Sequence, residues 1–101
     1  MIALHLPMAA ILLMHKKEVA GDEIIEVKVW KVEKSTNYPE GINYRMVYIK
    51  RGKRLLGYDN NTFEGHHKHR HGKKTPIRFT NLEHLFARFI KEIRRMRGER
   101  K

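Results

Sequence analysis

Four of the chain's seven histidines fall between Gly65 and Lys74, a segment in which every remaining residue is basic or glycine. It reads Gly-His-His-Lys-His-Arg-His-Gly-Lys-Lys. Imidazole is the one side chain that ordinarily titrates close to neutral pH, so neighbouring imidazoles can donate a proton, accept one or hold a metal ion. A run of ionisable side chains adds nothing to a packed core. The segment is therefore the first candidate for a functional site.

Acid–base chemistry on RNA is the use that we predict for this cluster, which would make the protein a metal-independent ribonuclease. Attack by the 2′-hydroxyl of RNA needs a base for that proton, an acid for the leaving 5′-oxygen and cations for the phosphorane charge. Two histidines, one neutral and one protonated, fit the first two roles without a metal ion. Lys68, Arg70 or Arg78 fits the third. Asp59, in the nearby triplet Tyr58-Asp59-Asn60, adds a carboxylate that can orient an imidazole.

Two other interpretations of the segment stay open. In an extended chain, His67, His69 and His71 would share one side and could hold zinc, which would make the protein a metal-dependent hydrolase. The flanking cations oppose a dication, so we predict neither a metal ligand nor a cofactor. Alternatively, the segment is a solvated basic loop that binds phosphate, and the protein is a non-catalytic module for nucleic acid or an acidic partner protein.

The charge of the chain points to an anionic partner. The formal net charge is +11, and residues 66–101 carry twelve basic side chains against three acidic ones, whereas residues 1–65 carry ten against eight. Such a basic half favours RNA, DNA or an acidic protein. The predicted nucleic-acid contacts are Lys68, Arg70, Lys73, Lys74, Arg78, Arg94 and Arg95. The absence of cysteine excludes disulfides, thiolate metal sites and cysteine nucleophiles.

The apolar start of the chain, Met1 to Met14, is too short to span a bilayer and lacks the basic region of a signal peptide. We therefore expect a cytoplasmic protein without a membrane segment. Pairing of two copies through this segment or through a sheet edge would give a homodimer, which the sequence does not require.

The hydrophobic pattern predicts an α+β fold. Alternating β-branched residues indicate strands at 24–32 and 43–50, and a tight turn returns residues 53–58 as a hairpin partner. Thr80 and Glu83 form a capping box before an amphipathic helix. We predict a single domain with a leader or edge segment (1–10), an antiparallel sheet of three to four strands (11–58), a His-rich loop (59–76), and a helix packed on one face (80–97).

Two adjacent motifs give the chain a resemblance to a known family. Gly57-Tyr58-Asp59-Asn60, followed by Thr62-Phe63-Glu64-Gly65-His66-His67-Lys68-His69, resembles the TumE family of toxins from toxin–antitoxin systems. The resemblance extends over roughly residues 12–95. It implies a growth-inhibiting toxin and a cognate antitoxin, expected to be of the helix-turn-helix type. Carried over by position, the matching residues are Tyr58, Asp59, Asn60, His66, His67, Lys68 and His69, and His71 lies outside the motif. From the acid–base chemistry of the residues we predict Tyr58, Asp59, His66, His67 and His69 as the catalytic set.

Overall fold

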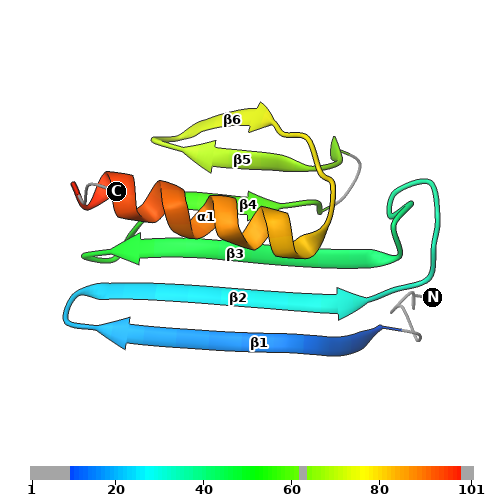
Figure 1. Cartoon of the computed structure of the whole chain (residues 1–101), viewed down its shortest axis with the longest axis horizontal. Coiled ribbons are helices and arrows are strands. Elements are labelled where there is room, and N and C mark those ends of the chain that lie inside the picture. The colour runs from blue at the N-terminus through cyan, green and yellow to red at the C-terminus, as the bar shows by residue number, and fades with distance from the viewer. Residues whose placement is uncertain (1–9, 62–63, 99–101) are drawn as a thin grey trace, which may run out of the picture.

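The computed structural model, which describes residues 10–61 and 64–98, contains one six-stranded antiparallel sheet and one helix. The strands follow one another in the sheet in chain order, as a meander (Figure 1). They are β1 (Ile11–Ala20), β2 (Glu23–Lys31), β3 (Ile42–Lys50), β4 (Lys53–Asp59), β5 (His67–Arg70) and β6 (Lys73–Pro76). The predicted α+β class is confirmed, but the prediction of three to four strands is wrong.

The two unpredicted strands, β5 and β6, lie inside the predicted His-rich loop of residues 59–76. Strand β5 alternates imidazoles with basic side chains and β6 reads Lys-Lys-Thr-Pro, so neither has the apolar periodicity by which strands are usually found. His71 and Gly72 join them, and both have positive φ angles (52° and 73°). This is the backbone of a tight two-residue hairpin turn. His67 and His69 therefore lie on a paired strand, whereas His66 precedes the strand and His71 lies in the turn.

Helix α1 (Leu82–Met96) begins one residue later than the capping box predicted. Asn81 is the N-cap, and its side-chain Oδ1 accepts a hydrogen bond from the backbone N–H of His84 at 2.7 Å. The hydroxyl of Thr80 instead lies 3.0 Å from Nδ1 of the His84 ring. The Asn81 cap satisfies one of the backbone donors that the first helical turn leaves free, so the helix needs no cap from Thr80.

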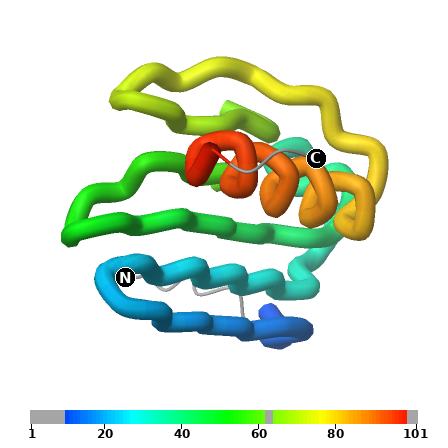
Figure 2. Tube along the Cα trace, turned by 60° about the vertical axis from the view of Figure 1, so that its left-hand side comes forward, coloured from blue at the N-terminus to red at the C-terminus, as the bar shows by residue number. Residues whose placement is uncertain are grey.

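The core lies between one face of the sheet and α1, which covers β3 and β4 in both views (Figures 1 and 2). It is built from alternate residues of β2, β3 and β4 and from one stripe of the helix. The buried members are Val27, Val29, Tyr44, Met46, Tyr48, Leu56, Tyr58, Leu85, Phe89 and Ile93. We call the sheet surface under α1 the helix face and the opposite surface the open face.

The β1 edge of the sheet extends beyond the helix. Its large apolar residues are exposed, among them Leu12 (52%) and Val19 (63%). The predicted leader, residues 1–10, falls almost entirely outside the described residues, so it is not assigned a structure. Within 10–61 and 64–98, no helix is both long and apolar enough to cross a membrane.

Candidate active site

Strand β5 divides the histidine segment between the two faces of the sheet. His67 pairs with Asp59 and His69 with Gly57, whereas Lys68 pairs with the core residue Tyr58. Residues directly opposite each other on antiparallel strands share a face, and successive residues on a strand alternate. His67 and His69 therefore lie on the open face with Asp59. Lys68 and Arg70 lie on the helix face, although the sequence analysis placed them beside the histidines.

Asp59, His67 and His69 form a compact cluster on the open face, which we call the triad. His67 Nε2 lies 3.0 Å from Asp59 Oδ1, and His69 Nε2 lies 3.6 Å from Asp59 Oδ2. One side-chain atom of each residue lies within 4.8 Å of the other two, a spacing that allows all three to hold one metal ion. Asp59 and His67 are buried, and the His69 side chain keeps 23% of its surface exposed.

The hydrogen bonds of His67 constrain its protonation. Nδ1 lies 2.9 Å from the carbonyl oxygen of Gly65, which can only accept, so this nitrogen carries a proton. Nε2 faces a carboxylate, which is a second acceptor. In a ring that carries its one proton on Nδ1, Nε2 offers a lone pair to a cation bound beside Asp59.

His69 has a different environment. Burial, followed by the charge of Arg54, lowers the pKa of His69 below its usual range and so favours the neutral ring. The Arg54 side chain crosses Gly57, where an added Cβ would lie 3.4 Å from its Cδ. Gly57 thus leaves room for a guanidinium on the open face near His69. Among the ring nitrogens of the triad, those of His69 are the more accessible to a substrate.

His66 is separated from the triad. Its ring stacks on Phe79 (centroids 4.4 Å apart) and on Tyr44 (5.6 Å), a residue of the helix face. Nδ1 lies 2.9 Å from the Tyr44 hydroxyl, and Nε2 lies 3.1 Å from a Glu40 carboxylate oxygen. Both ring nitrogens of His66 therefore contact groups within the protein. The structure places this predicted catalytic residue in packing contacts away from Asp59.

Tyr58 also lies away from the triad, in the core under α1. Its hydroxyl donates a 2.5 Å hydrogen bond to Glu92, a buried residue of the helix. The same Glu92 carboxylate accepts hydrogen bonds from Lys68 (3.0 Å) and Arg70 (2.9 Å). Burial, reinforced by Glu92, raises the pKa of Tyr58 and keeps its hydroxyl protonated. This predicted catalytic tyrosine belongs to an internal network that ties β4 and β5 to the helix.

The other predicted nucleic-acid contacts are spread over both faces. Lys74, opposite His69, is paired with Glu64, which also lies 3.9 Å from His67 Nε2. Lys73, on the edge strand β6, pairs with Arg70 of β5. Arg78 and Arg95 border hollows beside α1, and Arg94 lies in its last turn.

Sequence reasoning missed Glu92, Glu64 and Arg54. A signal for Glu92 exists, because it lies seven residues after Leu85 and three after Phe89 and so falls on the apolar stripe of the helix. An acid at such a position is expected to be buried and paired. The sequence gives no comparable signal for Glu64 or Arg54.

Fold and site together define a small, strongly basic α+β domain with a histidine–carboxylate cluster on the open face of its sheet. A family model described as Toxin TumE matches residues 11–97, which is most of the chain. The chain therefore belongs to the TumE family, the toxin component of a toxin–antitoxin system, and membership implies an antitoxin partner. No curated protein and no solved structure matches the chain.

Proposed function

We propose that this toxin hydrolyses phosphodiester bonds in RNA, with a divalent metal ion held by the triad of Asp59, His67 and His69. The observation that carries the proposal is the convergence of one oxygen and two nitrogens, each within 4.8 Å of the others, at the surface of a basic domain. Two imidazoles and a carboxylate are a common ligand set for zinc and related ions.

The placement of the histidines favours this chemistry over the two-histidine acid–base pair that the sequence suggested. An acid–base pair needs two imidazoles that exchange protons with the substrate. His67 is 5% exposed with both nitrogens engaged, and His66 is stacked away from the triad. Of the predicted catalytic histidines in the described part of the chain, only His69 remains for such a role. A metal site uses the buried ring of His67 as well, because a ligand does not need to meet the substrate.

Two further observations support a bound cation. A Gly65 carbonyl that holds the proton of His67 on Nδ1 would leave the lone pair on Nε2, the nitrogen that faces Asp59, and backbone carbonyls commonly orient metal-bound histidines in this way. Three of the four flanking cations that were expected to oppose a metal are paired with acids. Lys68 and Arg70 are on the helix face with Glu92, and Lys74 is paired with Glu64.

Each residue at or near the triad would have its own role in the hydrolysis. Asp59, His67 and His69 would hold the ion, and the chemistry it would supply is that of a Lewis acid for phosphate and water. In the hydrolysis, a water oxygen bonds to phosphorus and the bond from phosphorus to the leaving ribose oxygen breaks. Water loses one proton and the leaving oxygen gains one. Arg54, near His69, is placed to offset charge on the phosphate.

The test begins with purified protein stripped of metal by a chelator. We expect Zn²⁺ or Mn²⁺ to bind with a stoichiometry of one per chain in titration calorimetry, and cleavage of total RNA to need the added ion. Asp59→Asn and His69→Ala should abolish both, with circular dichroism confirming that each variant is folded. His71→Asn is the matched control, because it removes an imidazole outside the triad and Asn tolerates the positive φ there.

Each other outcome leads to a different conclusion. If cleavage survives the chelator but is lost in His69→Ala, the reaction does not need a metal, and His69 acts alone as the general base. Binding of RNA without any cleavage would leave the non-catalytic basic module. Absence of metal binding together with absence of cleavage would overturn the proposal.

A further inference from the structure

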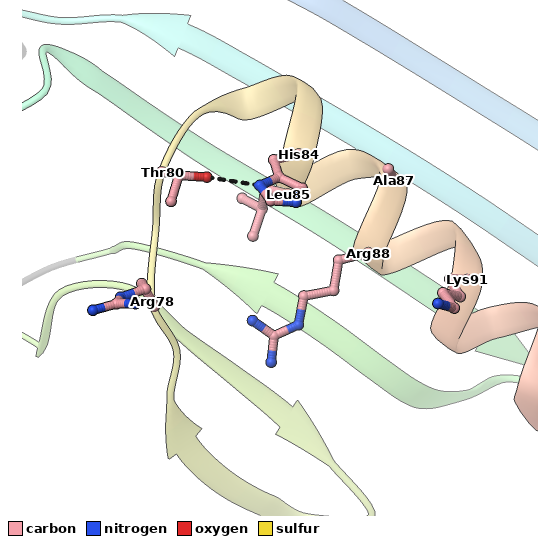
Figure 3. Close-up of a pocket in the computed structure, with 7 residues that line it drawn as sticks. All are labelled: Arg78, Thr80, His84, Leu85, Ala87, Arg88 and Lys91. Atoms are coloured by element: carbon pink, nitrogen blue, oxygen red, sulfur yellow. Dashed lines mark hydrogen bonds between the residues drawn. The ribbon is translucent and has the colours of Figure 1, made fainter.

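A basic groove runs along the side of α1 that faces the β5–β6 hairpin. It consists of two adjoining hollows of about 440 and 300 Å³ that share Arg88 and Lys91. The first is shown in Figure 3, where Arg88 extends from the helix and Arg78 stands on the segment that leads into it. The second is lined by Lys68, Arg70, Glu92 and Arg95 in addition to the shared pair. We call the two hollows together the basic groove.

The groove carries more positive charge than the protein neutralises. Among the residues that the structure describes, Glu92 is the one acid that lines it. That carboxylate already accepts from Tyr58, Lys68 and Arg70. Arg78, Lys91 and Arg95 form no ion pair with any residue in the described part of the chain. An elongated surface with uncompensated cations attracts a polyanion.

The spacing of the helix side chains that line the groove fits an extended polyanion. His84, Arg88, Lys91 and Arg95 follow at i, i+4, i+7 and i+11, so they line one side of α1. Eleven residues at the helical rise of 1.5 Å give a length of about 16 Å, enough for several phosphates of a single strand. Among the described residues, the lining contains no Phe, Tyr or Trp, and its one ring, that of His84, lies at the start of the row with Nδ1 3.0 Å from the Thr80 hydroxyl, so bases have few surfaces for stacking there. The groove is thus suited to the phosphate backbone and not to base recognition.

The groove and the triad lie on opposite faces of the sheet, separated by the β5–β6 hairpin at its edge. This edge is basic on both faces. On β6, Lys73 pairs with Arg70 of the helix face, and Lys74 pairs with His69 of the open face. A strand leaving the groove therefore meets a lysine on each side of the edge before it reaches the triad.

We propose that the basic groove binds the backbone of single-stranded RNA, which passes over the β5–β6 edge to present a distant bond to the triad. This inference rests on the proposed function, since it takes RNA as the substrate. It assigns Arg78, Arg88, Lys91 and Arg95 to binding along the strand. Because the contacts are with phosphates, binding should be steeply salt-dependent and nearly independent of sequence.

The experiment measures binding apart from cleavage. Fluorescein-labelled single-stranded RNA of mixed sequence, with 2′-O-methyl riboses, is titrated with the metal-free full chain, and anisotropy gives the Kd at several salt concentrations. The test variant is Lys91→Gln/Arg95→Gln. The matched control is Lys16→Gln/Lys17→Gln, which removes the same charge from β1 at the opposite edge of the sheet.

We expect the groove variant to bind about tenfold more weakly and its slope of log K against log salt to fall by about 1.4, for two lost phosphate contacts. The control should stay within about twofold of wild type, as expected for cations away from the strand. Equal weakening of both variants would overturn the inference, because it would reflect net charge alone. Unchanged RNA binding by the groove variant, with loss of antitoxin binding, would reassign the groove to an acidic protein.

The two proposals can fail separately. If wild type never cleaves RNA but the groove variant still loses RNA binding, the groove stands and the hydrolytic function falls. If wild type cleaves RNA and the groove variant binds RNA as tightly as wild type, the hydrolytic function stands and the groove proposal falls.

Discussion

Glu92→Gln is expected to destabilise the protein, although it removes no volume from the core. The amide can still accept from the Tyr58 hydroxyl, but Lys68 and Arg70 lose their anion and face an NH₂ group instead. A hydrogen bond to a charged group contributes about 1.5–3 kcal/mol. The side chains of Lys68 and Arg70 are 22% and 41% exposed, so solvent screens part of each interaction. We expect a total loss of about 2–3 kcal/mol, below the 3–5 kcal/mol typical of breaking a fully buried pair.

Urea denaturation at neutral pH measures this loss as the change in unfolding free energy. In thermal unfolding, a chain of this length should lose about 4–8 °C in Tm per kcal/mol. Glu83→Gln is the matched control, since it makes the same substitution at an exposed position in the first turn of the same helix. It should cost no more than about 1 kcal/mol through the helix dipole. A Glu92→Gln variant within about 0.5 kcal/mol of wild type would refute the reasoning.

The pH dependence of this difference supplies a second check. Burial alone would raise the pKa of Glu92, but hydrogen bonds from Tyr58, Lys68 and Arg70 outweigh it and lower the pKa below the usual 4.5. A carboxyl with a lowered pKa in the folded state stabilises fully above its unfolded pKa, and the contribution disappears as pH falls through the folded value. The gap between wild type and Glu92→Gln should therefore be constant down to about pH 5 and shrink below it. A gap that persists unchanged in strong acid would contradict the assignment.

Two further predictions concern the helix start and the exposed edge. Asn81→Ala should lower the unfolding free energy by about 1 kcal/mol and Thr80→Ala by clearly less, because Asn81 caps the helix. Urea denaturation measures both. A larger loss in Thr80→Ala would show that Thr80 is the N-cap, as the capping box predicted. Leu12→Lys on β1 should change the unfolding free energy by less than about 0.5 kcal/mol, since the residue is 52% exposed. It should also reduce any self-association through this sheet edge, which sedimentation measures. A large loss of stability would show that β1 is packed in solution.

The sequence was sufficient to predict the strands and the helix whose formation follows from hydrophobic periodicity. Strands β2, β3 and β4 and helix α1 were anticipated because their apolar residues recur at the spacing of a half-buried strand or helix. The pattern also placed Leu85 and Phe89 on the buried stripe of the helix, as observed. These elements supply the core, so the α+β class followed from them.

The site could be predicted by residue type but not by arrangement. Asp59, His67 and His69 were named from the sequence and do lie together. His66, next to His67 in the chain, could not be separated from them, because its partners Tyr44, Phe79 and Glu40 are remote in sequence. Such contacts are set by strand register, which a single sequence does not specify for a strand without an apolar face.

The alternation of β5 explains why imidazoles and basic side chains are interleaved in this segment. A strand sends successive side chains to opposite faces, so one short strand serves two functions. Its basic residues hold Glu92 under the helix, and its histidines meet Asp59 on the open face. A slip of one residue would exchange the two sets and would place imidazoles beside Glu92 and cations beside Asp59. The buried carboxylate therefore fixes the register of β5 against α1, and this contact on one face determines the geometry of the triad on the other.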